Sequence, residues 1–188
     1  MTRRLSHVIA FDDFAFDRAH RGAVSIVGAV YSNLRLDGVL CGEVQRDGSD
    51  SAEAIEQLVR GSRFFEHNHM IMLQGIALAG FNVVDIHALS EALEMPVLVV
   101  ARKEPNMARI REALLTKVEG GEAKWALIEK AGPMEPVADV FVQRAGLSAV
   151  EAAHVIGHFT TQSVIPVPLR TAHIIASGVS TGETRGRV

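Results

Sequence analysis

The stretch His69-Met-Ile-Met-Leu-Gln-Gly-Ile-Ala-Leu-Ala-Gly-Phe-Asn-Val-Val-Asp-Ile86 decides the fold. It opens with a short apolar run, Met70 to Leu73, and then meets Gln74-Gly75 where a strand would end. Gly80 follows five residues later, and apolar residues then recur at helical spacing through Val83 and Leu93. This pattern predicts a buried strand, a flexible turn and the start of a helix. In open α/β sheets, ligands bind at the carboxyl ends of such strands.

A second apolar run, Val8 to Phe11, ends abruptly in Asp12-Asp13. It predicts another buried strand, one that places an acid at its tip. Successive strand residues point to opposite faces of a sheet, so we expect only one of the two acids to face any one site.

Residues 23–31 and 34–41 are expected to form an antiparallel hairpin around Ser32-Asn33, with Asp37-Gly38 as the alternative turn. Ser49 is a plausible N-cap for a helix that ends near Gly61. Residues 96–101 predict a further buried strand, followed by a helix with its apolar stripe from Met107 to Val118.

Farther along the chain, residues 124–129 and 137–143 are interpreted as strands. Ser148 and Glu151 form a capping-box pattern that opens a helix reaching about His158, and a last helix is expected from Pro166 to about Gly178. The whole order predicts an α/β fold with a mixed sheet of about five to seven strands covered by helices.

Composition narrows the class of protein. The chain has 188 residues, is 48% apolar and carries a formal net charge of −3, which suits one domain with a sizeable core and does not indicate a strongly basic nucleic-acid binder. The single cysteine, Cys41, excludes an internal disulfide and is expected to be a small core residue. Because no apolar run reaches the length of a membrane span or a signal-peptide core, we expect a soluble, cytoplasmic protein.

Several motifs coincide along the chain: Ile9-Ala-Phe-Asp12, Asp47-Gly-Ser-Asp50, Gln74-Gly-Ile-Ala-Leu-Ala-Gly-Phe-Asn-Val-Val-Asp85, Pro96-Val-Leu-Val-Val100 and Pro166-Val-Pro-Leu-Arg-Thr-Ala-His173. Together they resemble an uncharacterised, largely archaeal family, domain of unknown function ninety-nine, which is similar to endonuclease V. The resemblance covers nearly the whole chain. It implies a single endonuclease-V-like domain over residues 1–188 with a ribonuclease-H-like fold, in which residues 179–188 are expected to form a mobile tail.

Endonuclease V cuts DNA or RNA near deaminated bases with magnesium, and the resemblance implies roles for individual residues here. Asp12 corresponds to the metal-binding aspartate at the first strand tip, and Lys103 to a lysine near the phosphate. Gln74 stands where those enzymes carry a second aspartate, and Val167 replaces the glutamate of their Pro-Glu-Pro-x-Arg string, which Pro166, Pro168 and Arg170 otherwise match. The late glycine–histidine motif is absent, because Leu147 follows Gly146.

The candidate site is assigned accordingly. The catalytic candidates are Asp12 and Lys103, the magnesium (or manganese) ligands are Asp12 with Asp47 or Asp50, and the substrate-binding candidates are Gln74, Gly75, Asn82, Arg102 and Arg170. Most of these residues also have a purely structural explanation. Asp47 and Asp50 suit a turn that enters a helix, Asn82 and Asp85 suit helix capping, and Arg102 and Lys103 suit a solvated loop. His154 and His158 are expected to pack within the fold.

Two functional hypotheses follow. The first is a metal-dependent nuclease that acts on DNA or RNA containing an altered base. The second is a nucleic-acid-binding module that has the same fold and lacks the chemistry, because Gln74 and Val167 replace carboxylates and the late histidine is missing. A small-molecule enzyme that uses the same strand-tip cleft is a third reading.

Overall fold

The computed structural model describes residues 3–184, and their central feature is a mixed sheet in the order β3-β2-β1-β4-β7-β9-β8. Its strands are β1 (His7–Asp13), β2 (Ala23–Ser32), β3 (Arg35–Gln45), β4 (Met70–Gln74), β7 (Val97–Ala101), β8 (Glu135–Val137) and β9 (Val140–Ala145). β1, β4 and β7 are parallel neighbours, whereas β2 and β9 run antiparallel beside them. The carboxyl ends of β1, β4 and β7 therefore meet at one edge of the sheet.

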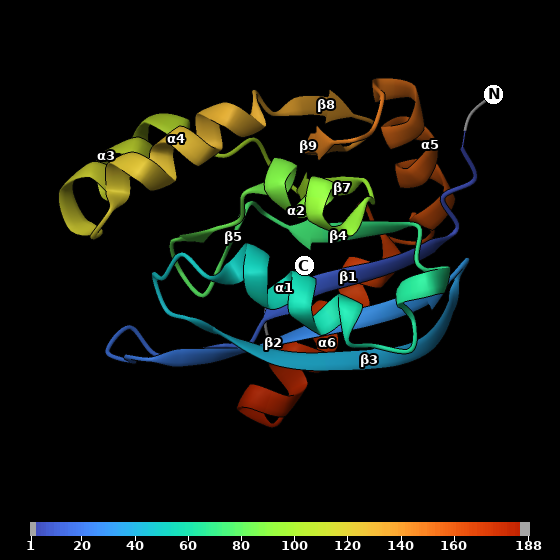
Figure 1. The fold of residues 1–188 in the computed structure, drawn as a ribbon, viewed down its shortest axis with the longest axis horizontal. Coiled ribbons are helices and arrows are strands. Elements are labelled where there is room, and N and C mark those ends of the chain that lie inside the picture. The colour runs from blue at the N-terminus through green and yellow to red at the C-terminus, as the bar shows by residue number, and fades with distance from the viewer. Residues whose placement is uncertain (1–2, 185–188) are drawn as a thin grey trace.

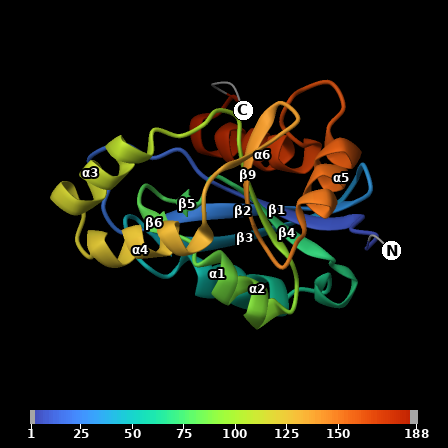
Figure 2. The ribbon, with the colours of Figure 1, turned by 90° about the horizontal axis from the view of Figure 1, so that it is seen from above.

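Helices cover both faces of this sheet. α1 (Ser51–Arg60) and α2 (Ile86–Leu93) lie on one face, and α5 (Ala149–Phe159) and α6 (Val167–Thr181) lie on the other, as Figures 1 and 2 show. The strand pleat divides the core in the same way, because Val8 and Ala10 pack toward α5 and α6 whereas Ile9 and Phe11 pack toward α1 and α2. The predicted mixed sheet flanked by helices is confirmed.

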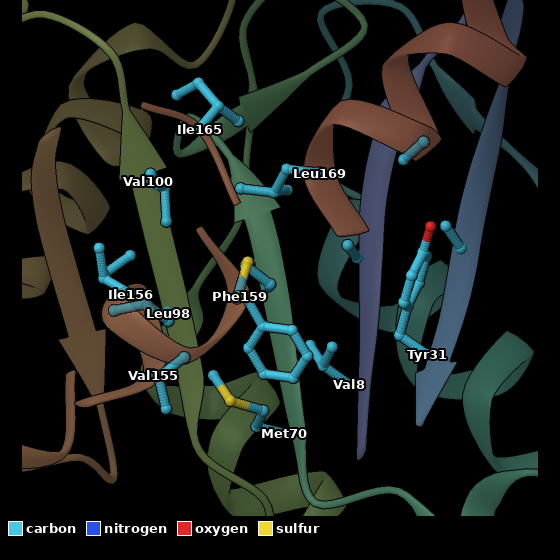
Figure 3. Packing of buried hydrophobic residues seen from close by; sticks show 14 of the residues in the cluster. Val8, Tyr31, Met70, Leu98, Val100, Val155, Ile156, Phe159, Ile165 and Leu169 are labelled. Carbon is cyan, nitrogen blue, oxygen red and sulfur yellow. The ribbon is translucent and has the colours of Figure 1, made fainter. Parts of the chain in front are cut away.

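The core on the side of α5 and α6 is drawn in Figure 3. Phe159 from α5 lies beside Val8 of β1 and Met70 of β4, and Leu169 from α6 lies near the carboxyl end of β4; all four side chains are buried. Tyr31 of β2 belongs to the same cluster, and its hydroxyl lies 2.8 Å from Oγ1 of Thr171 on α6. These contacts fix α6 across β1 and β2, which decides what the rest of that helix can reach.

A smaller unit extends from the carboxyl edge of the sheet. α3 (Met107–Lys117) and α4 (Gly121–Ala131) lie side by side, and the short hairpin of β5 (Ala77–Leu78) and β6 (Asn82–Val83) packs against them (Figures 1 and 2). Its core holds only Val83, Leu114 and Ile128 as fully buried apolar side chains, with partly buried residues around them. A short 3-10 helix, η1 (Phe65–His67), precedes β4 at the amino end of that strand, opposite the carboxyl edge of the sheet.

Several predicted elements have the right type and slightly different bounds. The first hairpin turns at Asn33, whose φ of 52° suits the tight turn, so the turn at Ser32-Asn33 is confirmed over Asp37-Gly38. Asp50 rather than Ser49 precedes α1. Asp85 caps α2 by accepting from the Ala88 N–H, and the capping box of Ser148 and Glu151 opens α5.

Two predicted elements were wrong. Residues 124–129, interpreted as a strand, belong to α4, because Lys124, Ile128 and Ala131 are buried at the spacing of a helix face. Val83, expected in a helix, lies in β6, and the helix begins only at Ile86.

The expected C-terminal boundary was also misplaced. Gly178, expected to end the last helix, lies inside α6, which continues to Thr181 and ends at Gly182 with a φ of 82°. Residues 179–181 of the expected tail are therefore helical, and residues 185–188 lie outside the described part of the chain.

Three expected burials were wrong as well. Cys41 is exposed because β3 is the edge strand and its outer positions are left uncovered. His154 and His158 are exposed on the outer side of α5. Between residues 3 and 184, none of the helices is both long enough and apolar enough to cross a bilayer.

Candidate active site at the carboxyl ends of the parallel strands

Asp12, at the carboxyl end of β1, pairs with His173 on α6. Its Oδ2 atom lies 2.9 Å from Nδ1 of His173, and its Oδ1 atom accepts a hydrogen bond from the Asp13 N–H. The Asp12 side chain is 9% exposed and the His173 side chain 23% exposed, so His173 is the more accessible partner. The pair joins the first strand to the last helix, across almost the whole length of the chain.

The pKa of Asp12 is raised from 3.8 to about 6, mainly by burial and then by the nearby Asp13 carboxylate, while the hydrogen bond from His173 opposes both effects. A buried carboxyl with a raised pKa at a strand tip is the kind of group found in catalytic sites. His173 contributes a second feature, because its Nε2 atom is buried and has no hydrogen-bond partner within residues 3–184. The pair therefore keeps one ring nitrogen available.

Gln74 lies next to Asp12 on the same face of the sheet. Phe11 pairs with Leu73 in the parallel register of β1 and β4, so Asp12 and Gln74 occupy the next position on the two strands. The Gln74 Oε1 atom is buried and accepts no hydrogen bond from the described residues. A buried acceptor without a donor is costly, so this oxygen is well placed to accept a donor or a cation that a ligand supplies.

A large polar cavity lies beyond Gln74 on this face. It has a volume of about 790 Å3 and is lined by Arg102, Asp139, Thr160, Thr161, Gln162, Ser163, Val164, Arg170, Ile174 and Thr184. Arg102 follows β7 and Arg170 lies in the first turns of α6. The structure thus brings two substrate-binding candidates, Arg102 and Arg170, to one cavity on the same sheet face as Asp12.

The other acid of the strand tip, Asp13, contacts the β5–β6 hairpin. Asp13 accepts a hydrogen bond of 2.7 Å from the Ala79 N–H, in the turn of the β5–β6 hairpin. Asp47 accepts from the Phe81 N–H at 2.8 Å in the same turn. Burial raises the pKa of Asp13, with the hydrogen bond from Ala79 opposing that rise. The Asp12 side chain and the charge of His173 also lower the pKa of Asp13, so the two acids are close electrostatic neighbours, and the expectation that only one of them faces any one site stays a prediction.

The predicted metal ligands Asp12, Asp47 and Asp50 are therefore not brought together. Asp47 and Asp50 hydrogen-bond around the β5–β6 hairpin, as Asp13 does. Within residues 3–184, no group of three or more His, Cys, Asp or Glu side chains is arranged to hold a metal ion. The expected metal site, made by Asp12 with Asp47 or Asp50, is therefore corrected by the structure.

Asn82, a predicted substrate-binding residue, has a structural role. It is fully buried, its Oδ1 accepts from the Ser51 N–H, and its Nδ2 donates to Gln45 O and to an Asp50 oxygen. Asp50 also accepts from the Gln45 N–H. These hydrogen bonds tie the entrance of α1 to β6 and leave Asn82 no exposed surface for a ligand.

Two further candidates lie at the edge of the site. Lys103 is exposed in the loop after β7 and stays a prediction as a phosphate contact. Gly75 follows Gln74 with a φ of 78°, a conformation that glycine adopts without strain. It lines an apolar cavity of about 270 Å3 between the β5–β6 hairpin and helices α3 and α4, together with Ile76, Phe81, Met107 and Met134 among others.

The site around Asp12 offers a magnesium ion fewer protein oxygen ligands than the sequence predicted. Magnesium prefers hard oxygen ligands and is commonly held by one or two carboxylates plus substrate phosphates and water. The Asp12 carboxylate and the unsatisfied Gln74 Oε1 atom provide two such oxygens on neighbouring strands. The residues therefore fit an ion whose coordination a substrate phosphate and water complete.

His173 is a candidate site residue to which the sequence alone assigned no role. It lies in the Pro166 to His173 string that carried the resemblance, but no spacing rule links it to Asp12. Its position in the structure explains the pairing, because α6 starts at Val167 and His173 lies on the face of that helix that packs over β1. Only the packing of the last helix on the first strand reveals the pair.

This arrangement, a mixed sheet with an acid at the tip of β1 and helices on both faces, is the fold of the endonuclease V class. Endonuclease V from Ciona intestinalis, solved with DNA containing an inosine, is 15% identical, with a TM-score of 0.57 over 89% of this chain and 82% of that one. At that identity the likeness establishes the fold. The predicted relation to endonuclease V is confirmed at this level.

The family is more specific. Residues 4–180 match the profile of endonuclease dU, and the chain belongs to that family. A UPF0215 protein of Deinococcus radiodurans is 52% identical over 98% of this chain and 94% of its own length. A protein of unknown function from Archaeoglobus fulgidus has a solved structure that is 32% identical, with a TM-score of 0.87 over 94% of this chain and 99% of that one.

Proposed function

We propose that the protein is a metal-dependent nuclease that cuts DNA or RNA beside a deaminated base, with Asp12 and His173 at its catalytic centre. The observation that carries this proposal is the Asp12–His173 pair at the carboxyl end of β1, beside the unsatisfied oxygen of Gln74. The name of the family and the inosine-containing DNA bound by the Ciona enzyme support the substrate class.

The roles of the residues follow from their positions. Asp12 and Gln74 would hold magnesium, which supplies a Lewis acid that polarises the phosphate and neutralises the charge that develops during hydrolysis. His173 orients the Asp12 carboxylate through Nδ1 and presents Nε2 as a hydrogen-bonding atom. Asp12 is needed as a carboxylate, and its raised pKa of about 6 keeps it largely ionised at pH 7 and above.

The apolar cavity beside Gly75 gives the altered base a place outside the helix stack. Enzymes that act on a single base take it out of the duplex into a pocket of apolar side chains with a few polar contacts. This cavity has that character, because Ile76, Phe81 and Met107 line it and Gln143 contributes an amide. The cavity opens beside Gly75, which directly follows Gln74 in the chain.

The test is cleavage of labelled oligonucleotides that contain dU or inosine, with unmodified strands as substrate controls. Wild-type protein with magnesium should cut the modified strands, and Asp12→Asn should not. Asp37→Asn is the matched control, because it removes the same charge from a surface ion pair with Arg35 on the edge strand β3. Equal cleavage by wild type and Asp12→Asn would rule out the proposed centre.

A second candidate function is nucleic-acid binding without cleavage. The observation in its favour is that Asp47 and Asp50, the carboxylates expected to complete the metal site with Asp12, hydrogen-bond to backbone and side-chain groups elsewhere. This function predicts salt-dependent binding that does not need magnesium. Tight binding to modified strands with no cleavage by any divalent cation would favour it over the nuclease.

A further inference from the structure

The polar cavity beside α6 lies two strands away from Asp12. β1, β4 and β7 are adjacent in the sheet, and Asp12, Gln74 and Arg102 follow their carboxyl ends on one face. Asp12 and Gln74 are level with Val100 in the strand register, so two strand spacings, about 10 Å, separate Asp12 from Val100, and Arg102 lies two residues farther along the chain. That span corresponds to a few nucleotides of one strand, since each nucleotide advances about 3.4 Å along a duplex.

The lining of the cavity suits a phosphodiester backbone. Arg170 is exposed, lines the cavity and makes no side-chain ion pair with any residue in the 3–184 range. The loop between α5 and α6 adds hydroxyl groups, and the Thr160 Oγ1 atom is buried without a hydrogen-bond partner among the described groups. Guanidinium and hydroxyl groups are the side chains that contact backbone phosphates most often.

The shape of the cavity favours an unpaired strand. The cavity of about 790 Å3 opens to solvent between α6 and the β8–β9 turn and has room for a nucleotide that has left its partner, whereas a duplex presents a broad convex surface. Asp139 lines the same cavity from that turn, together with Arg102 and Arg170. An anion that enters should be sensitive to each of these charges.

We infer that this cavity binds a backbone phosphate and its nucleotide from the strand that flanks the scissile position, with Arg170 as the phosphate contact and an unpaired strand as the preferred form. The inference rests on the proposed function for the location of the scissile phosphate. The binding itself needs neither magnesium nor cleavage.

The experiment measures binding of a fluorescent single strand and the matching duplex by anisotropy, without magnesium, over a range of salt concentrations. Arg170→Ala should weaken binding and reduce the slope of log affinity against log salt by about 0.7 for the single strand. Arg170→Lys should retain the slope. Arg63→Ala is the matched control, because Arg63 is exposed near the amino end of β4, away from the cavity.

Asp139→Asn provides a second test that leaves α6 untouched. Removal of this carboxylate should tighten binding of the single strand severalfold, whereas Glu66→Gln, an equal charge change at the opposite end of the sheet, should not. An unchanged slope for Arg170→Ala together with no gain for Asp139→Asn would overturn the inference. Stronger effects on the duplex than on the single strand would overturn the preference for an unpaired strand.

The two proposals fail in different ways. If wild type and Asp12→Asn cleave equally while the binding effects appear, the proposed function fails and the phosphate site stands. If cleavage depends on Asp12 while Arg170→Ala binds with the wild-type slope, the nuclease stands and the phosphate site fails.

Discussion

Nδ1 of His173 lies 2.9 Å from Oδ2 of Asp12, and this contact links α6 to the tip of β1. The other oxygen of this carboxylate accepts a hydrogen bond from the N–H of its neighbour, Asp13. Loss of the imidazole would leave the Asp12 oxygen free to rotate away from its position beside Gln74.

His173→Ala is therefore expected to lower kcat for cleavage about 10- to 100-fold with little change in KM, since partners that orient a metal-binding carboxylate have effects of this size. His173→Asn should recover part of the rate, because its amide can donate from nearly the position of Nδ1. Steady-state kinetics on a dU-containing strand checks this. A rise in KM with kcat unchanged would show instead that His173 contacts the substrate.

Asp12→Asn is expected to stabilise the protein above pH 6. The folded-state pKa of Asp12 is raised from 3.8 to about 6, so the carboxylate costs stability as the pH rises through this window. The advantage of Asn should be small below pH 4, grow between pH 4 and 6, and level off at no more than about 3 kcal/mol. Urea unfolding of both proteins from pH 4 to 8 measures it, and a difference that shrinks as pH rises would contradict the burial of Asp12.

Gln74→Asp tests the oxygen donors beside Asp12. A second carboxylate next to a buried one should lower the unfolding temperature in the presence of a chelator, because like charges repel at low dielectric. Magnesium should then raise the unfolding temperature of this variant more than that of the wild type. Gln74→Leu, which has no oxygen donor, is the matched control and should show no magnesium response. Equal magnesium responses in all three proteins would place the ion elsewhere.

Asn82→Ala is expected to destabilise the fold by about 2–4 kcal/mol, because it leaves buried donors and acceptors at Ser51, Gln45 and Asp50 without partners. Nucleic-acid binding per folded molecule should not change. Chemical unfolding and anisotropy measured on the same preparation separate the two effects. A stable variant with weakened binding would return Asn82 to the binding site.

The fold was predictable because its signals are local. The apolar runs before Asp12 and Gln74, the turn at Asn33 and the capping box of Ser148 each depend on residues close in sequence. The segment 124–129 was misread because a short apolar run shows no clear period until its packing against Leu114 and Val83 is known.

The site was predictable only in part. Asp12 and Gln74 could be placed together because parallel strands align their carboxyl ends. His173 could not, since its partner is 161 residues away and the register of α6 on β1 depends on the packing of Leu169 and Tyr31. Asp47 and Asp50 were wrongly assigned to the metal site because their positions depend on the β5–β6 hairpin, which the sequence did not reveal.

The modest core between α3, α4 and the β5–β6 hairpin has a consequence for how this end of the protein behaves in solution. With few buried apolar contacts, such a unit opens and recloses at a lower free energy than the central sheet. The walls of the cavity beside Gly75 belong to that unit, so they can part and admit a bulky heterocycle while β1, β4 and β7 stay intact. The uneven packing therefore combines a wall that can open transiently, made by α3, α4 and the β5–β6 hairpin, with a stable base, made by the central sheet.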